Sequence, residues 1–362
     1  MAHDVDTIAR IEGSISNGGW KITGTVFNDA DRLLFYQKMF AWFRLYTSAG
    51  WEAQIRPAFR GFLLPERWDK VFQTSVAPWS AVLAHELMKR GRIQGIFYKH
   101  VASSPGNRHQ IISMNYAKIV YEIIGGHCNF LIPGEESNYD SGNWSGAFTT
   151  RQYPEGFLFL DINTSASAAV SEYTLKEGGF WERIVEIADI EFFLAYVDLT
   201  STFHYIPHPM FGASLPTAVF TITSDHLLQP LRFEPRNTEE VGQVRIYGTT
   251  PKGEQLTGKY PTQPTAGPIV ERSGFMATTS GNITAMATRM YKFANRDFRI
   301  EAKLQGAVGL MLQLLDRVAV TYTSTPDGIA WSEKKFWVDG ITVEIGRDFN
   351  AVTTLILDAE NA

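Results

Sequence analysis

The chain has 362 residues, with a single cysteine, 13% aromatic residues and 20% charged residues. The lone Cys128 excludes an internal disulfide framework and a structural zinc site built from cysteines. The 33 basic and 38 acidic residues give a formal charge of −5, so the basic surface that wraps nucleic acid is absent. At about 150 residues per domain, the length predicts two or three domains. Few charges combined with many rings indicate surfaces that contact other proteins.

The amino terminus carries the acidic residues Asp4 and Asp6, where a secretory signal has a basic region followed by an apolar run. No stretch approaches about 18 continuous apolar residues, so we expect no transmembrane helix and no membrane insertion. The sequence therefore predicts a soluble protein made in a cytoplasm.

Residues 1–104 are predicted to form a small β-barrel with a helix on it. The ring-rich segment Ala41–Tyr46 ends at turn-forming residues, and Glu52–Leu64 is half-alternating, as in a strand. A helix is predicted after Pro78 and ends at Gly91. Its apolar residues recur at helical spacing: Trp79, Val82, Leu83 and Leu87.

Residues 105–212 are predicted to form an α+β domain. Ser113 is the expected cap of a helix that runs to Gly125. Gly156–Asp161 is predicted as a strand, and the apolar spacing from Phe180 to Ala188 predicts a second helix. Two ring-rich runs follow on either side of a short polar segment, which indicates a β-hairpin. These runs are Glu191–Val197 and Thr202–Ile206.

Strands predominate again in the last part of the chain. Residues 213–247 and 305–362 are predicted to form a second, split β-barrel, interrupted by a loop-and-helix insertion at 248–304. Within that insertion, the glycines and prolines of 248–272 predict a long irregular loop, followed by a helix from Ile283 to Ala294. The predicted fold class is therefore α+β and strand-dominated, with two small antiparallel β-barrels and two α+β insertions.

One segment resembles a phosphate-binding loop. Gly253–Tyr260 matches that motif except at its last position, which requires a small hydroxyl side chain to bind magnesium. Tyr260 is too large for this role, and Pro261 prevents the helix that the motif needs. We therefore predict a glycine-rich loop with a solvated lysine and no bound nucleotide.

The histidines do not form a metal site by spacing. His204 and His208 are four residues apart in a predicted strand, which separates them by about 13 Å, so each is predicted to be a half-exposed strand histidine. His127 and Cys128 are adjacent, and neighbouring side chains on an extended backbone point to opposite faces. Cys128 is therefore predicted to be a buried, inert thiol.

A polar loop contains three carboxylates, Glu135, Glu136 and Asp140, close to the rings of Tyr139 and Trp144. Carboxylates beside rings are what a glycoside hydrolase or a sugar-binding site needs. A solvated loop has the same composition, and this is the interpretation we favour. No catalytic, cofactor-binding or metal-ligating residue is therefore assigned, and the chain is predicted not to be an enzyme.

The order of the predicted modules is a strand-rich barrel, an α+β insertion and a split second barrel with its own insertion. This order resembles the baseplate hub protein of bacteriophage tails. Several local patterns are also similar to that family: Phe59–Leu64, Ile119–His127, Phe180–Ala188, Ala195–Asp198, Tyr205–Pro207, Leu314–Val320, Phe336–Ile341 and Thr353–Leu357. These are packing and turn patterns, and none of them is catalytic.

The resemblance implies a structural virion protein that acts as a homotrimer at the tail tip or baseplate. Three chains with two barrels each present six barrels to a six-fold tail tube. The implied partners are the tail tube or distal tail protein, the tape measure protein, and the central spike or fibre. Three chains at −5 each carry −15, so the channel repels passing DNA during genome ejection and binds none specifically. Assembly is expected in the host cytoplasm.

Two alternatives come from the polar loop. One is a tail-associated cell-wall or polysaccharide hydrolase that uses the Glu135, Glu136 and Asp140 carboxylates. The other is a receptor-binding or glycan-binding tail-tip protein, in which Tyr139 and Trp144 stack on a sugar. The sequence favours the structural hub over both.

Overall fold

Strands predominate in the computed structural model of the chain, and four α-helices lie among the described residues, which confirms the predicted α+β class. The structure describes residues 7–27, 38–43, 46–47, 50–51, 56–64, 76–103, 109–124, 151–152, 158–212, 214–235, 240–250, 252–277, 279–296, 298–324, 328–346 and 350–360. Its short elements are β4 (Tyr46–Thr47), β5 (Gly50–Trp51), β8 (Arg92–Ile93), β14 (Gly178–Gly179), η3 (Pro209–Phe211), η4 (Ser224–His226) and η5 (Val308–Met311).

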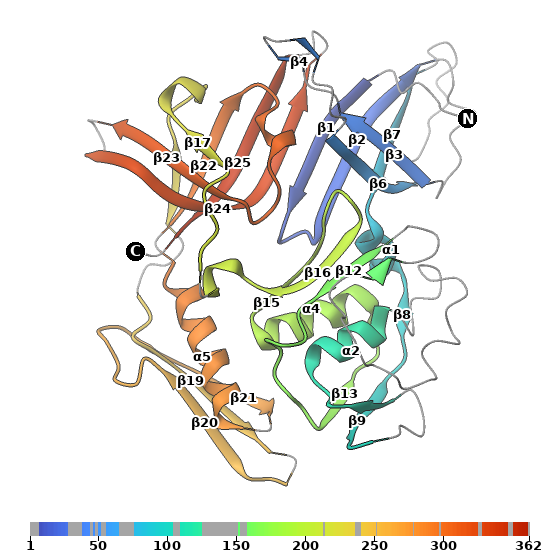
Figure 1. The fold of residues 1–362 in the computed structure, drawn as a ribbon, viewed down its shortest axis with the longest axis vertical. Helices are drawn as coiled ribbons and strands as arrows, with labels where there is room; N and C mark the ends of the chain where they lie inside the picture. Colours follow the sequence, from blue (N-terminus) through green and yellow to red (C-terminus); the bar gives the residue numbers. More distant parts are fainter. Residues whose placement is uncertain are drawn as a thin grey trace.

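One large sheet of eleven strands spans the upper half of the molecule in Figure 1. Its N-terminal half contains β1 (Thr7–Ser14), β2 (Gly19–Phe27), β7 (Val76–Val82), β6 (Arg56–Leu64) and β3 (Lys38–Phe43). Its C-terminal half contains β18 (Arg232–Pro235), β22 (Phe298–Gln305), β25 (Ala351–Ala359), β24 (Ile329–Ile345), β23 (Arg317–Ser324) and β17 (Phe220–Ile222).

The two halves are joined through β24, which is 17 residues long. Its first part pairs with β23 and its last part pairs with β1. On its other edge, β25 pairs with the stretch Phe336–Ile345. Neither half closes into a barrel among the described residues. The predicted strands of both halves are therefore present, whereas the two closed barrels are not confirmed.

The predicted helix after Pro78 is wrong at its start. Residues Val76–Val82 form β7, which pairs with β2 and, in part, with β6. Only Ala84–Arg90 is helical, as α1. Pairing with two strands that are distant in sequence outweighs the helical spacing of a few apolar residues, because such local preferences are weak.

An α+β module occupies the lower right of Figure 1 and matches the predicted helices and hairpin. Its helices are α2 (Tyr116–Glu122) and α4 (Phe180–Glu191). Asn115, not the predicted Ser113, caps α2, because its side chain accepts from the backbone N–H of Lys118 at 2.9 Å. The strands are β9 (Ile96–Val101), β10 (Gln110–Ile112), β13 (Glu172–Leu175), β11 (Arg151–Gln152), β12 (Phe159–Ile162), β15 (Phe193–Val197) and β16 (Thr202–Pro207).

The segment predicted as an irregular loop, 248–272, instead belongs to a small sheet. Its strands are β19 (Gln243–Thr249), β20 (Gln255–Tyr260) and β21 (Ile269–Met276), and α5 (Ser280–Ala294) packs against them. The prediction was wrong because its glycines were taken as loop residues. Gly258 instead lies in a strand, where β20 comes so close to the backbone of α5 that a Cβ atom has no room. This unit, β19–β21 with α5, lies at the lower left of Figure 1 and is called the α5 module below.

Two strands belong to a different unit from the one in which the predicted insertion boundaries place them. β22, predicted within 248–304, pairs with β25 in the large sheet. β19, predicted within the second barrel, begins at Gln243 and pairs with β20 and β21 in the α5 module. Strand partners far apart in sequence decide these assignments, and composition does not reveal them.

The buried apolar residues form two clusters. The larger one runs continuously from the large sheet into the α+β module, and the smaller one lies between α5 and its sheet. Ile190 and Phe192, at the end of α4, pack against the smaller cluster. No helix among the described residues is long and apolar enough to cross a membrane.

Candidate functional site

The residues considered for catalysis or sugar binding, Glu135, Glu136, Tyr139, Asp140 and Trp144, lie outside the described residues, as do His127 and Cys128. The phosphate-loop look-alike ends in the strand β20, and the next element is the strand β21, where the motif requires a helix. Within the described ranges, no group of three or more histidine, cysteine, aspartate or glutamate side chains is placed to hold a metal ion.

His208 is not the half-exposed strand residue that the sequence predicts. It follows the end of β16, is buried, and caps η3 by accepting from the backbone N–H of Met210 at 3.1 Å. Its ring meets the edge of the Trp337 ring at 5.3 Å. Pro207 and Pro209 lie on either side of His208 and end the strand there, so His208 does not continue its alternation, which explains the difference.

His204 lies on β16 between two carboxylates. Its Nδ1 is 2.8 Å from Asp161 and its Nε2 is 3.1 Å from Asp198, while the Tyr196 ring stacks on it. Burial alone would lower the pKa of His204, but the two carboxylates outweigh burial and raise it to about 9. Asp198 also accepts from Thr200 and Thr202 in the hairpin turn. The protonated His204 therefore links Asp161 of β12 to Asp198 in the turn of the β15–β16 hairpin.

The most elaborate polar arrangement lies along α5 and connects three parts of the molecule. Arg289 and Phe293 are four residues apart, so they lie on the same side of the helix. Arg296 follows just after the helix ends. These three residues reach the α+β module, a cleft and the large sheet, respectively. We treat this junction as the candidate functional site.

At the lower end of the junction, Arg289 reaches the α+β module. Its guanidinium donates to the backbone oxygen of Glu191 at 3.1 Å and to that of Ala166 at 3.0 Å. It also lies 4.9 Å from the centre of the Phe193 ring, a cation–π contact. One side chain of α5 thus holds the end of α4 and the loop before β13.

The Glu191 carboxylate is fully buried beside this contact. It accepts from the backbone N–H of Ala168 at 2.5 Å, from Ser167 Oγ at 2.9 Å and from Tyr205 Oη at 2.7 Å. Burial raises the pKa of Glu191 to about 7, although these hydrogen bonds and the charge of Arg289 oppose the rise.

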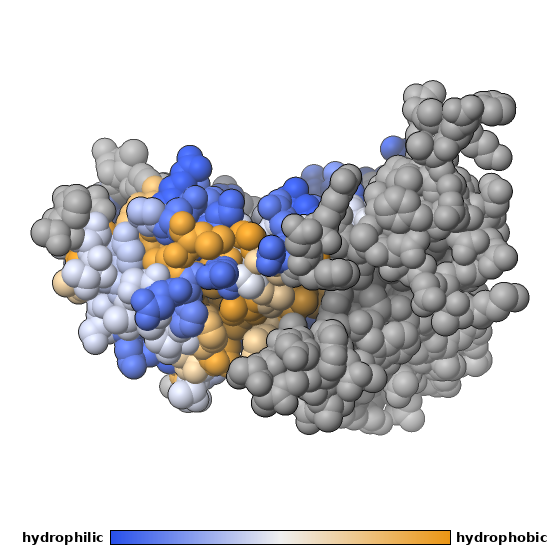
Figure 2. All heavy atoms as spheres, turned by 90° about the horizontal axis from the view of Figure 1, so that it is seen from above, coloured by the Kyte–Doolittle hydropathy of each residue, from blue (hydrophilic) through white to orange (hydrophobic). Residues whose placement is uncertain are grey.

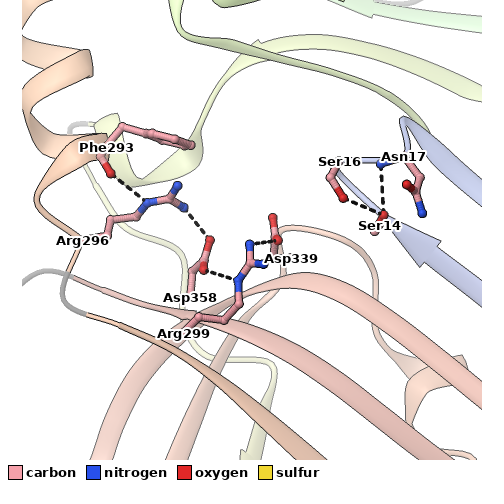
Figure 3. Close-up of polar contacts among 8 residues, drawn as sticks. All are labelled: Ser14, Ser16, Asn17, Phe293, Arg296, Arg299, Asp339 and Asp358. Carbon is pink, nitrogen blue, oxygen red and sulfur yellow. Dashed lines mark hydrogen bonds and ion pairs between the residues drawn. The ribbon is translucent and has the colours of Figure 1, made fainter. Parts of the chain in front are cut away.

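At the upper end, Arg296 reaches the large sheet, as Figure 3 shows. Its Nη1 is 2.5 Å from Asp358 Oδ2, and its guanidinium lies 3.5 Å from the centre of the Phe293 ring. Arg299 of β22 binds the other oxygen of Asp358 at 3.3 Å and Asp339 at 2.5 Å. Two arginines and two aspartates thus connect the end of α5 to β22, β24 and β25.

Between these two contacts lies a cleft of about 490 Å³. Its walls carry four phenylalanines from both modules: Phe192, Phe193, Phe275 and Phe293. Asp189 of α4 and Arg272 of β21 bring opposite charges to the cleft. Each of these arginine, carboxylate and ring contacts joins two modules of the same chain, so the arrangement fixes the position of α5 between its neighbours.

Comparison with known proteins places this geometry in a wider group. No family model and no curated protein matches the sequence. Among solved structures, a tail protein from Neisseria meningitidis aligns over 98% of this chain and 92% of its own length, with a TM-score of 0.61 and 12% identity. The chain has the fold of a phage tail protein.

Two prophage proteins share this tail-protein fold. A prophage tail protein from Listeria monocytogenes aligns over 98% of this chain and 88% of its own, with a TM-score of 0.53 and 11% identity. A 43 kDa prophage tail protein from Shewanella oneidensis covers 97% and 93%, with a TM-score of 0.54 and 10% identity. The resemblance seen in the sequence is thus confirmed at the level of the fold.

Sequence reasoning missed the residues of the junction. Arg289, Arg296 and Asp358 are charged residues in or beside apolar segments, and nothing in their spacing indicates a shared contact. The available signal lies on α4, whose buried face includes the charged Arg183 and Glu191. A charge on the apolar face of a helix predicts a buried partner, though not which one.

Proposed function

We propose that the chain is a structural hub of a phage-like tail, located at the tail tip or baseplate. In this role it joins the tail tube or distal tail protein to the central spike or fibre and surrounds part of the DNA channel. The observation that carries the proposal is the tail-protein fold, which matches the Neisseria tail protein over nearly the full length of both chains.

Exposed apolar side chains support a role in assembly. Val219 is 59% exposed, and Phe97, Leu228 and Met311 are also well exposed. Figure 2 looks down on the top of the molecule and shows an apolar area over the C-terminal half of the large sheet, bordered by polar residues. Apolar surface with a polar border is typical of protein contact sites.

The arrangement we propose is a homotrimer in which the N-terminal and C-terminal halves of the large sheet repeat around the channel. The α+β module and the α5 module project from this ring. The tape measure protein is a further partner. With −5 on each chain, the channel repels DNA and lets it pass without specific binding. No catalytic step is part of this role.

Native mass measurement of the purified chain tests the oligomeric state. We expect a particle with three times the mass of the chain, either alone or after addition of its tail partners. Such a particle forms when each chain contacts the next through two different surfaces and the third chain closes the ring. A monomer that persists at high concentration, and in the presence of the distal tail protein, contradicts the proposal.

A further inference from the structure

A large aromatic side chain is exposed on the sheet β10–β9–β13 of the α+β module. Phe97 of β9 is 52% exposed. Strand β13 pairs with β9 so that Thr174 lies opposite Phe97 and Glu172 lies opposite Lys99. These four residues share one face of the sheet, because alternate residues of a strand point to the same side, while Tyr98 is buried on the other face. The exposed ring therefore has a basic and an acidic side chain beside it.

The cleft between the α+β module and the α5 module is lined by rings that other side chains hold in place. Arg296 lies 3.5 Å from the centre of the Phe293 ring, as Figure 3 shows. Arg289 lies 4.9 Å from the centre of the Phe193 ring, and Tyr205 packs against the same ring at 5.0 Å. Rings that are fixed before a partner arrives lose little entropy on binding. The cleft of about 490 Å³ is therefore a preformed apolar site at a junction between modules.

The backbone is strained where the chain leaves α4 at this cleft. Phe192 has a φ of 55°, in the left-handed region that large side chains rarely adopt. Its ring lines the cleft and packs against the core of the α5 module. Strain of this kind persists only where the surrounding structure holds it, and it is common at binding sites.

The cleft carries one exposed charge of each sign. Asp189 of α4 and Arg272 of β21 both line it and are both exposed. They lie near enough for the charge of Arg272 to oppose the rise that burial causes in the pKa of Asp189. Neither side chain forms a hydrogen bond or an ion pair within the part of the chain that the structure describes. A partner that fits must bring an apolar side chain with a basic and an acidic residue beside it.

We propose that the cleft of one chain receives the Phe97 ring of a second copy. Beside that ring, Lys99 meets Asp189 of the first chain. Glu172 in turn meets Arg272. An aromatic side chain that enters a pocket lined by rings is typical of the residues that dominate the energy of a protein contact.

The two surfaces lie in different parts of the chain. Figure 1 shows β9 and β13 at the lower end of the α+β module, whereas the cleft lies between that module and the α5 module. Each chain therefore offers both a ring and a cleft, and contacts of this heterologous kind close into a ring of chains. The contact rests on the proposed homotrimer and names two of the surfaces that build it.

Sedimentation equilibrium of the full-length protein, under the conditions in which the wild type is a trimer, tests this contact. Phe97→Asp brings a charge to the apolar cleft and is expected to raise the dissociation constant about a hundredfold, as loss of a dominant aromatic residue does. Ile269→Asp is the matched control, because it introduces the same charge at a residue that is 41% exposed and is not part of the cleft lining. That variant should keep the wild-type dissociation constant.

Reversal of one charge pair tests how the two copies are oriented. Lys99→Asp and Asp189→Lys are each expected to raise the dissociation constant about tenfold, and the double variant should return to the wild-type value. Both side chains are exposed, so these variants should fold as the wild type does, and circular dichroism checks that they do.

The outcomes separate this contact from the homotrimer itself. A trimer that is as tight in Phe97→Asp as in the wild type overturns the contact and leaves the homotrimer standing. A trimer that is lost in Asp189→Lys and kept in Phe97→Asp shows that another segment occupies the cleft, which also overturns it. A double variant that is no tighter than the single variants contradicts the pairing of Lys99 with Asp189. A wild-type chain that stays monomeric with its tail partners overturns the contact and the homotrimer together.

Discussion

Replacing Asp358 with alanine is expected to lower the free energy of unfolding by about 3 to 5 kcal/mol. The side chains of Asp358 and Arg296 are 1% and 2% exposed, and their charged atoms are 2.5 Å apart. Without the aspartate, the buried guanidinium of Arg296 loses the carboxylate that it contacts, while Arg299 loses one of its two carboxylate partners. The penalty of a buried, uncompensated charge is much larger than the net contribution of the intact pair.

Chemical denaturation of the variant and the wild type measures this difference. The exposed pair of Arg10 and Glu12 provides the control, because both of its side chains are well exposed and lie 3.0 Å apart. Glu12→Ala should lower the free energy of unfolding by less than about 1 kcal/mol. A loss below about 1 kcal/mol for Asp358→Ala would show that the junction with the large sheet does not depend on this network.

Replacing Gly258 with alanine is expected to disrupt the packing of α5 on its sheet. If a small shift of the helix makes room for the new methyl group, the free energy of unfolding should fall by about 3 kcal/mol. A Cβ atom at this position would lie 2.4 Å from the backbone nitrogen of Thr284 and 2.5 Å from the carbonyl carbon of Ile283. Backbone atoms of a helix cannot turn aside as a flexible side chain can. The whole helix must therefore move away from β20.

Thermal unfolding followed by circular dichroism detects this change, and exchange of the α5 amides locates it. Gly281→Ala is the control on the same helix, since its nearest neighbour would be 3.7 Å from the new Cβ atom. That substitution should leave stability unchanged or raise it by up to about 1 kcal/mol, because alanine is the better helix former. Equal effects at the two glycines would contradict the close approach seen at Gly258.

The elements that the sequence predicts well are those whose local pattern and burial agree. In α4, Phe180, Ile184 and Ala188 recur at helical spacing, and all three are buried in the structure. The same holds in α5 for Ile283, Met286 and Met290. Strict alternation likewise identifies β22, because one of its faces is buried against the core.

Long-range pairing explains what the sequence does not predict. Val76–Val82 becomes a strand because β2 and β6 lie beside it, and neither partner is visible from the local pattern. The glycines of 248–272 indicate a loop by composition, but Gly258 is present because a helix lies against it. Arg289 binds two backbone oxygens, and a backbone oxygen carries no sequence signal. The junction could therefore be found only in three dimensions.

Electron microscopy of assembled tails that carry a labelled copy of this chain tests the tail-hub proposal most directly. The tail-hub proposal predicts three labels for each tail, all at the tip or baseplate end. Labels spread along the tube, labels on the head, or tails that assemble completely without the chain would contradict it.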